Sequence, residues 1–476
     1  MATTLTRTIG TPSSQRIGTL SFWLKRCQVN RGVSSGSTRI IQYQGSPTYF
    51  SIYMDDRSAN ANWSRLRIHM ADNQSPQYVV GTEMRFRDCN AWYHIVVRID
   101  TTQATAANRI RVYVNGGGGN SGGNYAQLGG LSDEGQQPAQ DYDIPGWASG
   151  QTTTIGGGSS MYLSQMIFAD GQSYAPSTFG SFDSNGEWVP NNSPSVTYGN
   201  NGYKLDFTES GAAANSSGFG ADTSGNDNHF ASSNLGDNPN VTDAPENNFS
   251  TLNYLQPYVT TNGLEGTLTK GNLYSTGTAS GKTSGVGNMG LRSGKWYWEA
   301  KLTADNNYST IGVHSHINKM VNNQPNGNGV LGYSSQGWAY WTYSTGYKMN
   351  NDTSSTWGVD ATTGDILSVA LDLDNLKIYI AKNGTWMESG DPTSGSTGTG
   401  SMYTLTAVDS TFDKAYFPVV GDSSSSQTAT WEVNFGNPTF AIASSNSDAN
   451  GYGKFEYAVP SGYYAICSKN VGVYGG

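Results

Sequence analysis

Charged residues are scarce in this chain. Asp, Glu, Lys and Arg together account for 13% of its 476 residues. Because helix surfaces are usually built from Glu, Lys, Arg and Ala, this shortage excludes coiled coils, helical repeats and α-solenoids. Gly, at 60 residues, and aromatic residues, at 12%, are abundant instead. Aromatic residues favour strands and glycine favours turns, so the composition predicts an all-β protein.

A basic surface and long apolar runs are also missing. The formal net charge is −9 and no run of Lys or Arg stands out, whereas a nucleic-acid partner requires a basic surface. No apolar stretch approaches the roughly 20 residues of a membrane-spanning helix. We therefore expect neither nucleic-acid binding nor insertion into a membrane.

Cysteine is limited to Cys27, Cys89 and Cys467, an odd number at wide spacing without a Cys-x-x-Cys pair. This arrangement excludes a disulfide framework and a cysteine-based zinc site. The first residues contain no apolar signal-peptide core. We expect buried free thiols and a protein made in a reducing compartment.

The clearest strand pattern in the first half covers residues 92–100, where Ile95, Val97 and Ile99 fall on one face. A second alternating run begins at residue 109 and ends in an Asn-Gly pair at 115–116. Such a pair favours a turn with positive φ. Together the two runs predict an antiparallel hairpin.

The same order recurs in the second half of the chain. Residues 366–374 alternate, residues 376–381 form the return strand, and another Asn-Gly pair follows at 383–384. The repeat predicts two tandem antiparallel jelly-roll β-sandwiches joined by a turn-rich, ordered connector. The boundaries we assign are 1–170 for the first sandwich, 171–250 for the connector and 251–476 for the second sandwich.

Two groups of motifs carry family resemblances. The first domain resembles a laminin-G-like domain of the concanavalin-A type, on Phe22-Trp23-Leu24-Lys25-Arg26, Ala91–Asp100 and Arg111–Gly116. The C-terminal half resembles a SPRY (B30.2-like) domain, on Ser293–Glu299, Ile311-Gly312-Val313, Gly364–Asp372, Phe417-Pro418-Val419 and Val433–Gly436. These resemblances imply a concanavalin-A-like sandwich followed by a SPRY-like sandwich.

The whole chain, including Phe168–Gln172, Asp222–Asn226 and Pro460–Cys467, is similar to structural proteins of tailed phages, often marine ones. That resemblance implies a virion protein, assembled in the host bacterial cytoplasm, whose partners are other virion proteins and further copies of itself in a homo-oligomer. It implies a tail-fibre or other appendage component that binds a host-surface glycan or protein receptor. A capsid decoration, cement or head-fibre protein is the alternative.

Glucanases share this sandwich fold, so a catalytic carboxylate pair has to be considered. Retaining glycosidases hold two carboxylates about 5–5.5 Å apart, and a Glu-x-Asp-x-x-Glu strand motif would place them on one face. The sequence contains no such string. We predict a protein that is not an enzyme, with a polysaccharide depolymerase as the less favoured alternative.

Aromatic and amide side chains concentrate at residues 343–357. Sugars are bound by aromatic faces and by amide or carboxylate hydrogen bonds, and the SPRY resemblance implies that rim loops form the ligand face. The candidate ligand residues are Tyr347, Asn350, Asn351, Asp352 and Trp357, with Trp63 and Trp147 in the first domain. The alternative is that Trp338, Trp341 and Trp357 fill the core, and that Trp63 and Trp147 make contacts between subunits.

Calcium is the one cofactor to consider, because laminin-G-like and lectin sandwiches often bind it at the rim through Asp and Asn oxygens. The rim candidates are Asp55, Asp56 and Asn115. No spacing motif supports them, so we expect no cofactor, with a calcium site as the alternative.

Overall fold

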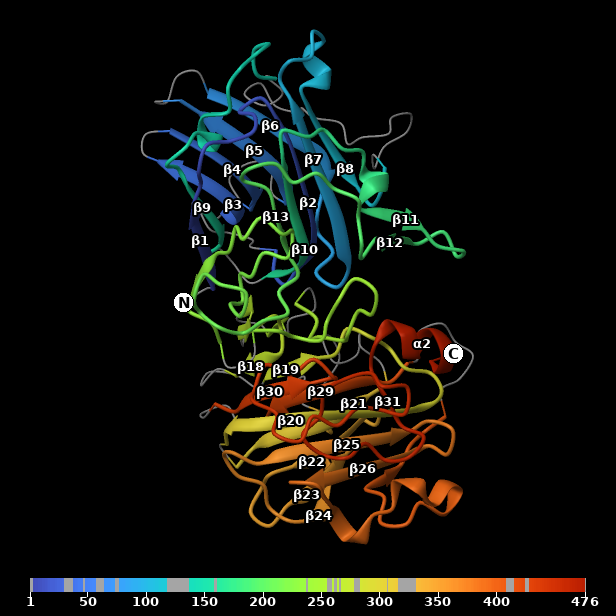
Figure 1. Cartoon of the computed structure of the whole chain (residues 1–476). Coiled ribbons are helices and arrows are strands. Elements are labelled where there is room, and N and C mark those ends of the chain that lie inside the picture. Colours follow the sequence, from blue (N-terminus) through green and yellow to red (C-terminus); the bar gives the residue numbers. More distant parts are fainter. Residues whose placement is uncertain are drawn as a thin grey trace. The chain divides into compact units, whose positions relative to one another are not determined.

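The computed structural model describes residues 3–29, 37–45, 48–56, 64–72, 77–117, 137–157, 161–236, 239–254, 259–260, 263–264, 267–277, 283–305, 307–315, 331–407, 415–423 and 428–475. The chain divides into two compact units, Met1–Asn240 and Val241–Gly476. Both are built from β-strands joined by turns and short helices, as Figure 1 shows.

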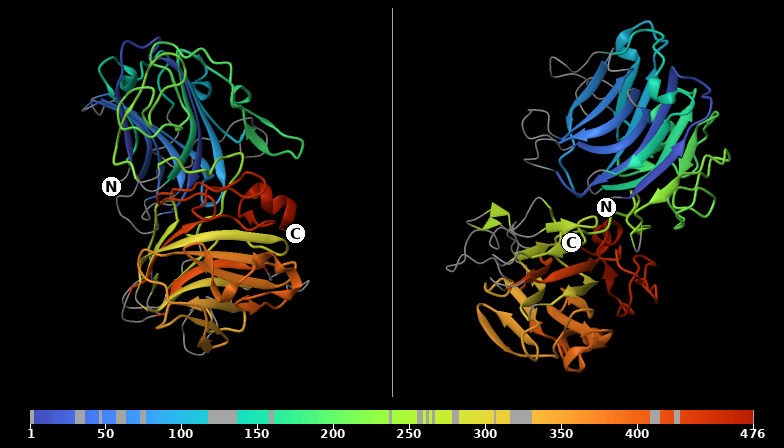
Figure 2. Two further views of the ribbon diagram at one scale, coloured as in Figure 1. Left: turned by 60° about the horizontal axis from the view of Figure 1, so that its bottom comes forward. Right: turned by 90° about the vertical axis from the view of Figure 1, so that its left-hand side faces the viewer.

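The first unit is a sandwich of two antiparallel sheets (Figure 2). The seven-stranded sheet has the order β14-β1-β9-β3-β4-β5-β6, and the five-stranded sheet has the order β13-β10-β2-β7-β8. Their strands are β1 (Thr4–Thr8), β2 (Ile17–Arg26), β3 (Ser37–Gly45), β4 (Thr48–Asp55), β5 (Arg65–Ala71), β6 (Gln77–Arg85), β7 (Trp92–Asp100), β8 (Ile110–Val114), β9 (Thr152–Gly156), β10 (Met161–Asp170), β13 (Tyr203–Leu205) and β14 (Ala231–Ser233).

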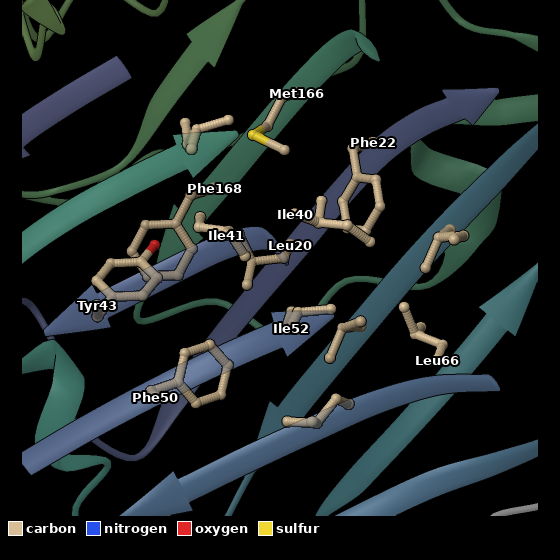
Figure 3. Close-up of a cluster of buried hydrophobic side chains, with 14 of the residues drawn as sticks. Leu20, Phe22, Ile40, Ile41, Tyr43, Phe50, Ile52, Leu66, Met166 and Phe168 are labelled. Carbon is tan, nitrogen blue, oxygen red and sulfur yellow. The ribbon is translucent and has the colours of Figure 1, made fainter. Parts of the chain in front are cut away.

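A continuous apolar core fills the space between these two sheets. Phe22 and Phe168 reach it from the five-stranded sheet, and Phe50 and Ile52 reach it from the seven-stranded sheet (Figure 3). Burying one such side chain contributes about 1.5–3 kcal/mol to folding. The core-facing side chains of β7 and β8 are the alternating residues that the sequence predicted, and the two strands pair antiparallel.

Residues 171–240 extend the first sandwich. β13 pairs with β10, and β14 pairs with β1. A hairpin of β11 (Gly180–Phe182) and β12 (Trp188–Pro190) follows the short helix η3 (Pro176–Thr178). On the outer face of the five-stranded sheet, Phe179 packs with Val96, Tyr113 and Ile167.

The second unit is also a β-sandwich, with sheets of nine and six strands. Their orders are β17-β18-β30-β20-β25-β26-β27, joined by β28 and β31, and β19-β29-β21-β22-β23-β24. The strands are β17 (Thr267–Thr269), β18 (Tyr274–Thr276), β19 (Thr283–Val286), β20 (Lys295–Ala304), β21 (Ser309–His314), β22 (Gly337–Trp341), β23 (Tyr347–Asn350), β24 (Thr353–Thr356), β25 (Ile366–Asp372), β26 (Lys377–Lys382), β27 (Thr385–Trp386), β28 (Tyr403–Thr404), β29 (Phe417–Asp422), β30 (Thr430–Asn434) and β31 (Tyr464–Ala465). The unit also contains a separate pair, β15 (Val259–Thr260) and β16 (Gly263–Leu264), the short helices η4 (Met387–Ser389) and η5 (Pro392–Thr397), and the helix α2 (Ser468–Tyr474).

A buried carboxylate ties the C-terminal segment to the second sandwich. Glu299, on β20, is fully buried and accepts hydrogen bonds from the Tyr297 hydroxyl, the Asn434 amide and the backbone N–H groups of Glu456 and Tyr457. Burial raises the pKa of Glu299, although these donors oppose the shift. The four donors occupy both carboxylate oxygens, so Glu299 acts as a structural anchor.

The three cysteines, Cys27, Cys89 and Cys467, are buried and free of disulfides, as the sequence predicted. Burial raises the pKa of Cys89 to about 12, which leaves this thiol unreactive at neutral pH. Among the residues that the structure describes, no helix combines the length and apolar character needed to cross a bilayer.

Candidate ligand-binding site

Alternation along β22 and β23 brings aromatic side chains to the outer face of the six-stranded sheet. Trp338 and Tyr340 point into the core between the sheets. Because neighbouring strand residues point to opposite faces, Trp341 lies on the outer face. Tyr347 is its register partner on β23 and lies on the same face.

Four rings form what we call the aromatic cluster: Tyr308, Trp341, Tyr343 and Tyr347. The Trp341 and Tyr343 rings stack with centroids 4.9 Å apart and an interplanar angle of 26°. Tyr308 lies 5.8 Å from Trp341 and 5.6 Å from Tyr343, and Tyr347 meets Tyr343 edge-on at 5.6 Å. Tyr343 is 39% exposed, so the cluster presents a ring to solvent.

A carboxylate and a serine hold the segments that carry this cluster. Asp305 Oδ1 accepts hydrogen bonds from Ser309 Oγ at 2.7 Å and from Thr342 Oγ1 at 2.8 Å. Ser423 donates from its backbone N–H and its hydroxyl to the carbonyl of Tyr308. The rings are therefore carried by backbone that is fixed from two sides, which lowers the entropic cost of binding a ligand.

Two polar atoms beside the cluster lack a hydrogen-bond partner within the described part of the chain. They are Trp341 Nε1 and Thr310 Oγ1, and both are shielded from solvent. Thr310 is the register partner of Trp341 on β21. A buried polar group without a hydrogen-bond partner costs about 1–3 kcal/mol of folding free energy. These two atoms therefore destabilise the fold at this position.

The predicted loop residues separate into three roles. Tyr347 belongs to the aromatic cluster, whereas the Asn350 side-chain amide donates to the carbonyls of residues 334, 335 and 337 and serves the backbone. Asn351 and Asp352 form the exposed two-residue turn between β23 and β24, with φ of 51° and 56°. Trp357 is 8% exposed and packs in the core, so its prediction as a ligand contact is wrong.

The tryptophan candidates of the first domain give no ligand surface. Trp147 is 2% exposed, and its ring lies 5.6 Å from Phe50 and 5.3 Å from Phe168 in the core. Its prediction as a ligand or subunit contact is wrong, because long-range packing buries a residue whose sequence neighbours are polar. Trp63 lies outside the described residues.

The calcium candidates of the first domain are engaged in other contacts. Asp55 and Asp56 are fully buried; Asp55 Oδ2 lies 2.7 Å from Arg67 Nη1, and Asp56 Oδ2 lies 2.6 Å from Arg26 Nη2. Burial raises the pKa of Asp56 despite the neighbouring guanidinium. Asn115 follows β8, in the other sheet, and its Oδ1 accepts a hydrogen bond from the backbone N–H of residue 94 at 2.8 Å. The two aspartates are thus neutralised by arginines rather than exposed at a rim.

A metal site has no other support in the described ranges. No group of three or more His, Cys, Asp or Glu side chains among those residues is arranged to hold an ion. Within those ranges, no cluster of three such side chains therefore supports the calcium alternative.

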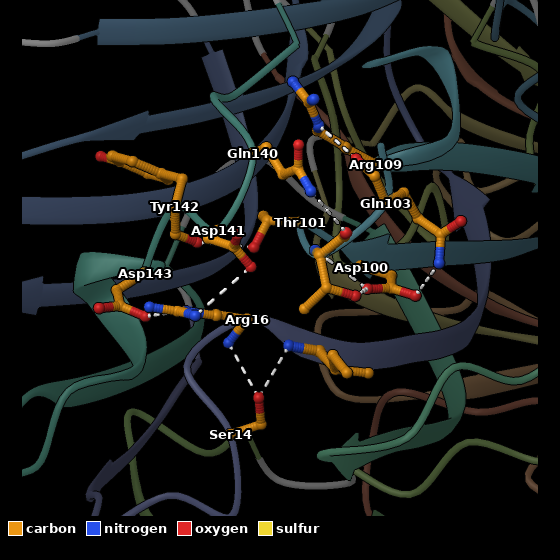
Figure 4. A network of polar contacts seen from close by, with 12 residues as sticks. Ser14, Arg16, Asp100, Thr101, Gln103, Arg109, Gln140, Asp141, Tyr142 and Asp143 are labelled. Atoms are coloured by element: carbon orange, nitrogen blue, oxygen red, sulfur yellow. Dashed lines mark hydrogen bonds and ion pairs between the residues drawn. The ribbon is translucent and has the colours of Figure 1, made fainter. Parts of the chain in front are cut away.

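A polar groove of the first unit is a second candidate surface. A cavity of about 490 Å³ is lined by residues 11–16, Asp143 and Ser149. Figure 4 shows its arginine, Arg16, whose Nε lies 2.7 Å from Asp143 Oδ1 and whose Nη1 lies 3.4 Å from Asp141 Oδ1. Asp143 raises the pKa of Arg16 above its ordinary value. Because the carboxylates already satisfy this cation, the groove offers a ligand less than the aromatic cluster does.

Sequence reasoning missed Tyr308, Trp341 and Tyr343 as surface residues. The alternative prediction placed Trp341 in the core with Trp338, but the two residues are three positions apart on one strand and so point to opposite faces. The odd spacing of Trp338 and Trp341 along the strand was the sequence signal that separates them. Tyr308 gave no local signal, since its neighbours in the cluster come from other strands.

Comparison with known families bears on both units. Residues 6–134 match the family described as the concanavalin A-like lectin/glucanases superfamily, of the laminin-G type, and residues 295–438 match the SPRY domain. The chain has a concanavalin-A-like N-terminal domain and a SPRY C-terminal domain. Both are β-sandwich families, which confirms the predicted fold class. No curated protein matches the sequence.

Solved structures with similar parts include a toxin and two SPRY-type domains. The stonustoxin structure has 19% identity and a TM-score of 0.28, and the match covers 39% of this chain and 27% of that chain. The SPRY domain of human HERC1 has 19% identity and a TM-score of 0.26, covering 35% and 91%. The PSpry domain of TRIM65 has 13% identity and a TM-score of 0.28, covering 39% and 89%. The chain thus spans about a quarter of the length of stonustoxin.

Proposed function

We propose that this protein is a non-enzymatic structural protein of a tailed-phage virion, a tail-fibre or other appendage component that binds a host-surface glycan through the aromatic cluster of its SPRY domain. The two domain families support a binding or structural role. The virion setting is supported by the resemblance of the whole chain to phage structural proteins.

The aromatic cluster is the observation that carries the binding proposal. The faces of sugar rings that bear C–H groups pack against aromatic rings, and partly exposed Tyr side chains add hydroxyl groups for hydrogen bonds. Tyr343 supplies the most exposed ring, and Trp341 stacks behind it.

Binding by a single site of this kind is expected to be weak. A virion that carries several copies converts weak binding into strong adsorption by avidity. This arrangement suits an appendage, whose role is to hold a particle on a surface without consuming the ligand.

A glycan array and a pull-down with host cells, both using the full chain, test the binding proposal. We expect the chain to retain host cells or host glycans and Tyr343→Ala to lose that retention. Phe182→Ala is the matched control, because Phe182 is an aromatic residue of the first unit that is 61% exposed. Failure of the chain to bind any glycan or cell, or equal losses in both variants, would contradict the proposal.

The capsid alternative differs in location. Labelling the chain on purified particles and locating it by electron microscopy distinguishes the two locations. Label on the tail or an appendage supports the proposal, and label confined to the capsid supports a decoration protein.

The depolymerase alternative predicts new reducing ends when host polysaccharide is incubated with the chain, and we expect none.

A further inference from the structure

Among the described residues, no strand pairs with the outer side of β24, so this strand is a sheet edge. It is the terminal strand of the six-stranded sheet, and all four of its residues, Thr353–Thr356, are exposed. The two turn residues before it are exposed as well. An edge strand presents unpaired N–H and C=O groups that can pair with another strand.

Edges of the five-stranded sheet in the first unit are occupied. On β8, the side chain of Gln137 accepts from the N–H of Ile110 at 3.0 Å and donates to the Ile110 carbonyl at 3.3 Å. On β13, Asp222 accepts from the N–H of Lys204 at 2.8 Å, and Thr223 donates to the Lys204 carbonyl at 2.9 Å. Neither edge is open at these positions to an added strand.

Edges of two other sheets are covered by neighbouring segments in the same way. On β14, the N–H of Ser232 donates to the carbonyl of Ala212 at 2.9 Å. On β19, at the opposite end of the sheet that ends in β24, the N–H of Asn253 donates to the carbonyl of Val286 at 2.7 Å. Within the described ranges, segments of the chain therefore cover these edges in both units, whereas none covers β24.

The free groups of β24 belong to Ser354 and Thr356. Trp357, which follows the strand, donates its N–H to the carbonyl of Gly346 on the side of β23. Backbone groups alternate in direction along an antiparallel strand, so those of Ser355 also point toward β23. The N–H and C=O groups of Ser354 and Thr356 consequently point away from the sheet.

The side chains of β24 do nothing to block pairing. Proteins protect exposed edges with Lys, Pro, bulges or inward-pointing charges. β24 is Thr-Ser-Ser-Thr, without charge and without proline. By contrast, the edge strand β6 of the seven-stranded sheet carries the charged residues Glu83 and Arg85.

We propose that β24 pairs antiparallel with β24 of a second copy of this chain, around a two-fold axis at Ser355. This register places Ser354 opposite Thr356 of the second copy, and the symmetry repeats that pair. Both residues have outward N–H and C=O groups, so each pair exchanges N–H···O=C hydrogen bonds. The six-stranded sheets of the two copies become one continuous sheet.

Self-complementarity identifies a second copy as the occupant. The paired side chains are small hydroxyl residues on both copies, and the register puts Asp352, the nearest charge on the strand, opposite Gly358. No like charges meet along the paired strands, although each chain carries a net charge of −9. Tyr347 is the register partner of Thr356 on β23, so pairing also brings the aromatic clusters of two copies onto one sheet.

Sedimentation of the full chain over about a hundredfold range of protein concentration tests the proposal. The variants introduce charged side chains on β24 that face each other across the proposed interface. Wild type is expected to pass from monomer to dimer. Ser354→Lys/Thr356→Lys places Lys opposite Lys and is expected to weaken the dimer at least about tenfold. Ser354→Lys/Thr356→Glu, the matched control, places Lys opposite Glu twice and is expected to restore dimerisation.

Three results would overturn the proposal. They are a wild-type chain that stays monomeric throughout the range, a double-lysine variant that dimerises like wild type, and a Lys/Glu variant that remains as weak as the double-lysine variant. Circular dichroism of each variant confirms that all are folded, since the substituted residues are exposed and their N–H groups are not needed by β23. Glycan binding does not enter this test, so it can fail or succeed independently of the proposed function.

Discussion

Trp188 donates its indole N–H to Nδ1 of His94, with the two nitrogens 2.9 Å apart. Because an indole nitrogen can only donate, Nδ1 of the neutral imidazole is an acceptor and Nε2 carries the proton. Nε2 lies 2.9 Å from Ser21 Oγ and therefore donates to it. The ring also lies between Trp23 and Trp188, and this buried contact fixes the β11–β12 hairpin on the first sandwich.

His94 predicts a pH dependence of stability. Burial lowers the pKa of His94 to about 3. Since the unfolded value is about 6.5, the unfolded chain takes up the proton first as the pH falls. The stabilisation is thus fully present above about pH 6.5 and declines toward pH 3, by up to about 1.4 kcal/mol per pH unit. Urea unfolding of wild type and His94→Gln at several pH values checks this, and parallel curves for the two proteins would contradict it.

Gly116 predicts a clash with the same tryptophan. A Cβ atom there would lie 2.2 Å from Cζ3 of Trp188, and the residue has φ of +77°. Gly116→Ala is expected to displace the indole and to make the β11–β12 hairpin sensitive to limited proteolysis. Gly150→Ala is the matched control, because Gly150 has φ of +86° but open space around its missing Cβ. Equal proteolysis of both variants would show that backbone strain, rather than the contact with Trp188, is responsible.

The buried ion pair of Arg26 and Asp56 predicts a large loss of stability. Arg26→Met leaves the Asp56 carboxylate buried without its cation, which costs about 3–5 kcal/mol in the free energy of unfolding. The same change at the exposed Arg16, which pairs with Asp143, is expected to cost far less. Chemical unfolding followed by fluorescence measures both losses. Similar losses in the two variants would contradict the assignment of Arg26 as a core ion-pair residue.

How much of this could be read from the sequence depends on the range of the interactions. The hairpin of β7 and β8 was predictable, because its alternation and its Asn-Gly turn are local signals. Trp147 was not, since its burial depends on Phe50 and Phe168, which come from strands on either side of the sandwich. The charged candidates failed for the same reason: the arginines that neutralise Asp55 and Asp56 lie on other strands.

Of the aromatic residues predicted for the candidate binding site in the second unit, Tyr347 lies in the aromatic cluster and remains a predicted ligand residue. Trp357 follows the edge strand and turns into the core, so its prediction as a ligand contact is wrong. Tyr308 joins the cluster only through strand pairing across the sheet, which no local pattern encodes. The pairing of β13 and β14 with strands about 40 and 225 positions away is likewise a tertiary result.

Tyr343 is the most exposed ring of the aromatic cluster, so the proposed binding of a glycan should depend on it. Calorimetric titration with a glycan that the wild-type chain retains compares Tyr343→Phe, which keeps the ring, with Tyr343→Ala, which removes it. We predict that Tyr343→Phe binds nearly as well as wild type and that Tyr343→Ala binds about tenfold more weakly. Unchanged affinity of Tyr343→Ala would contradict the claim.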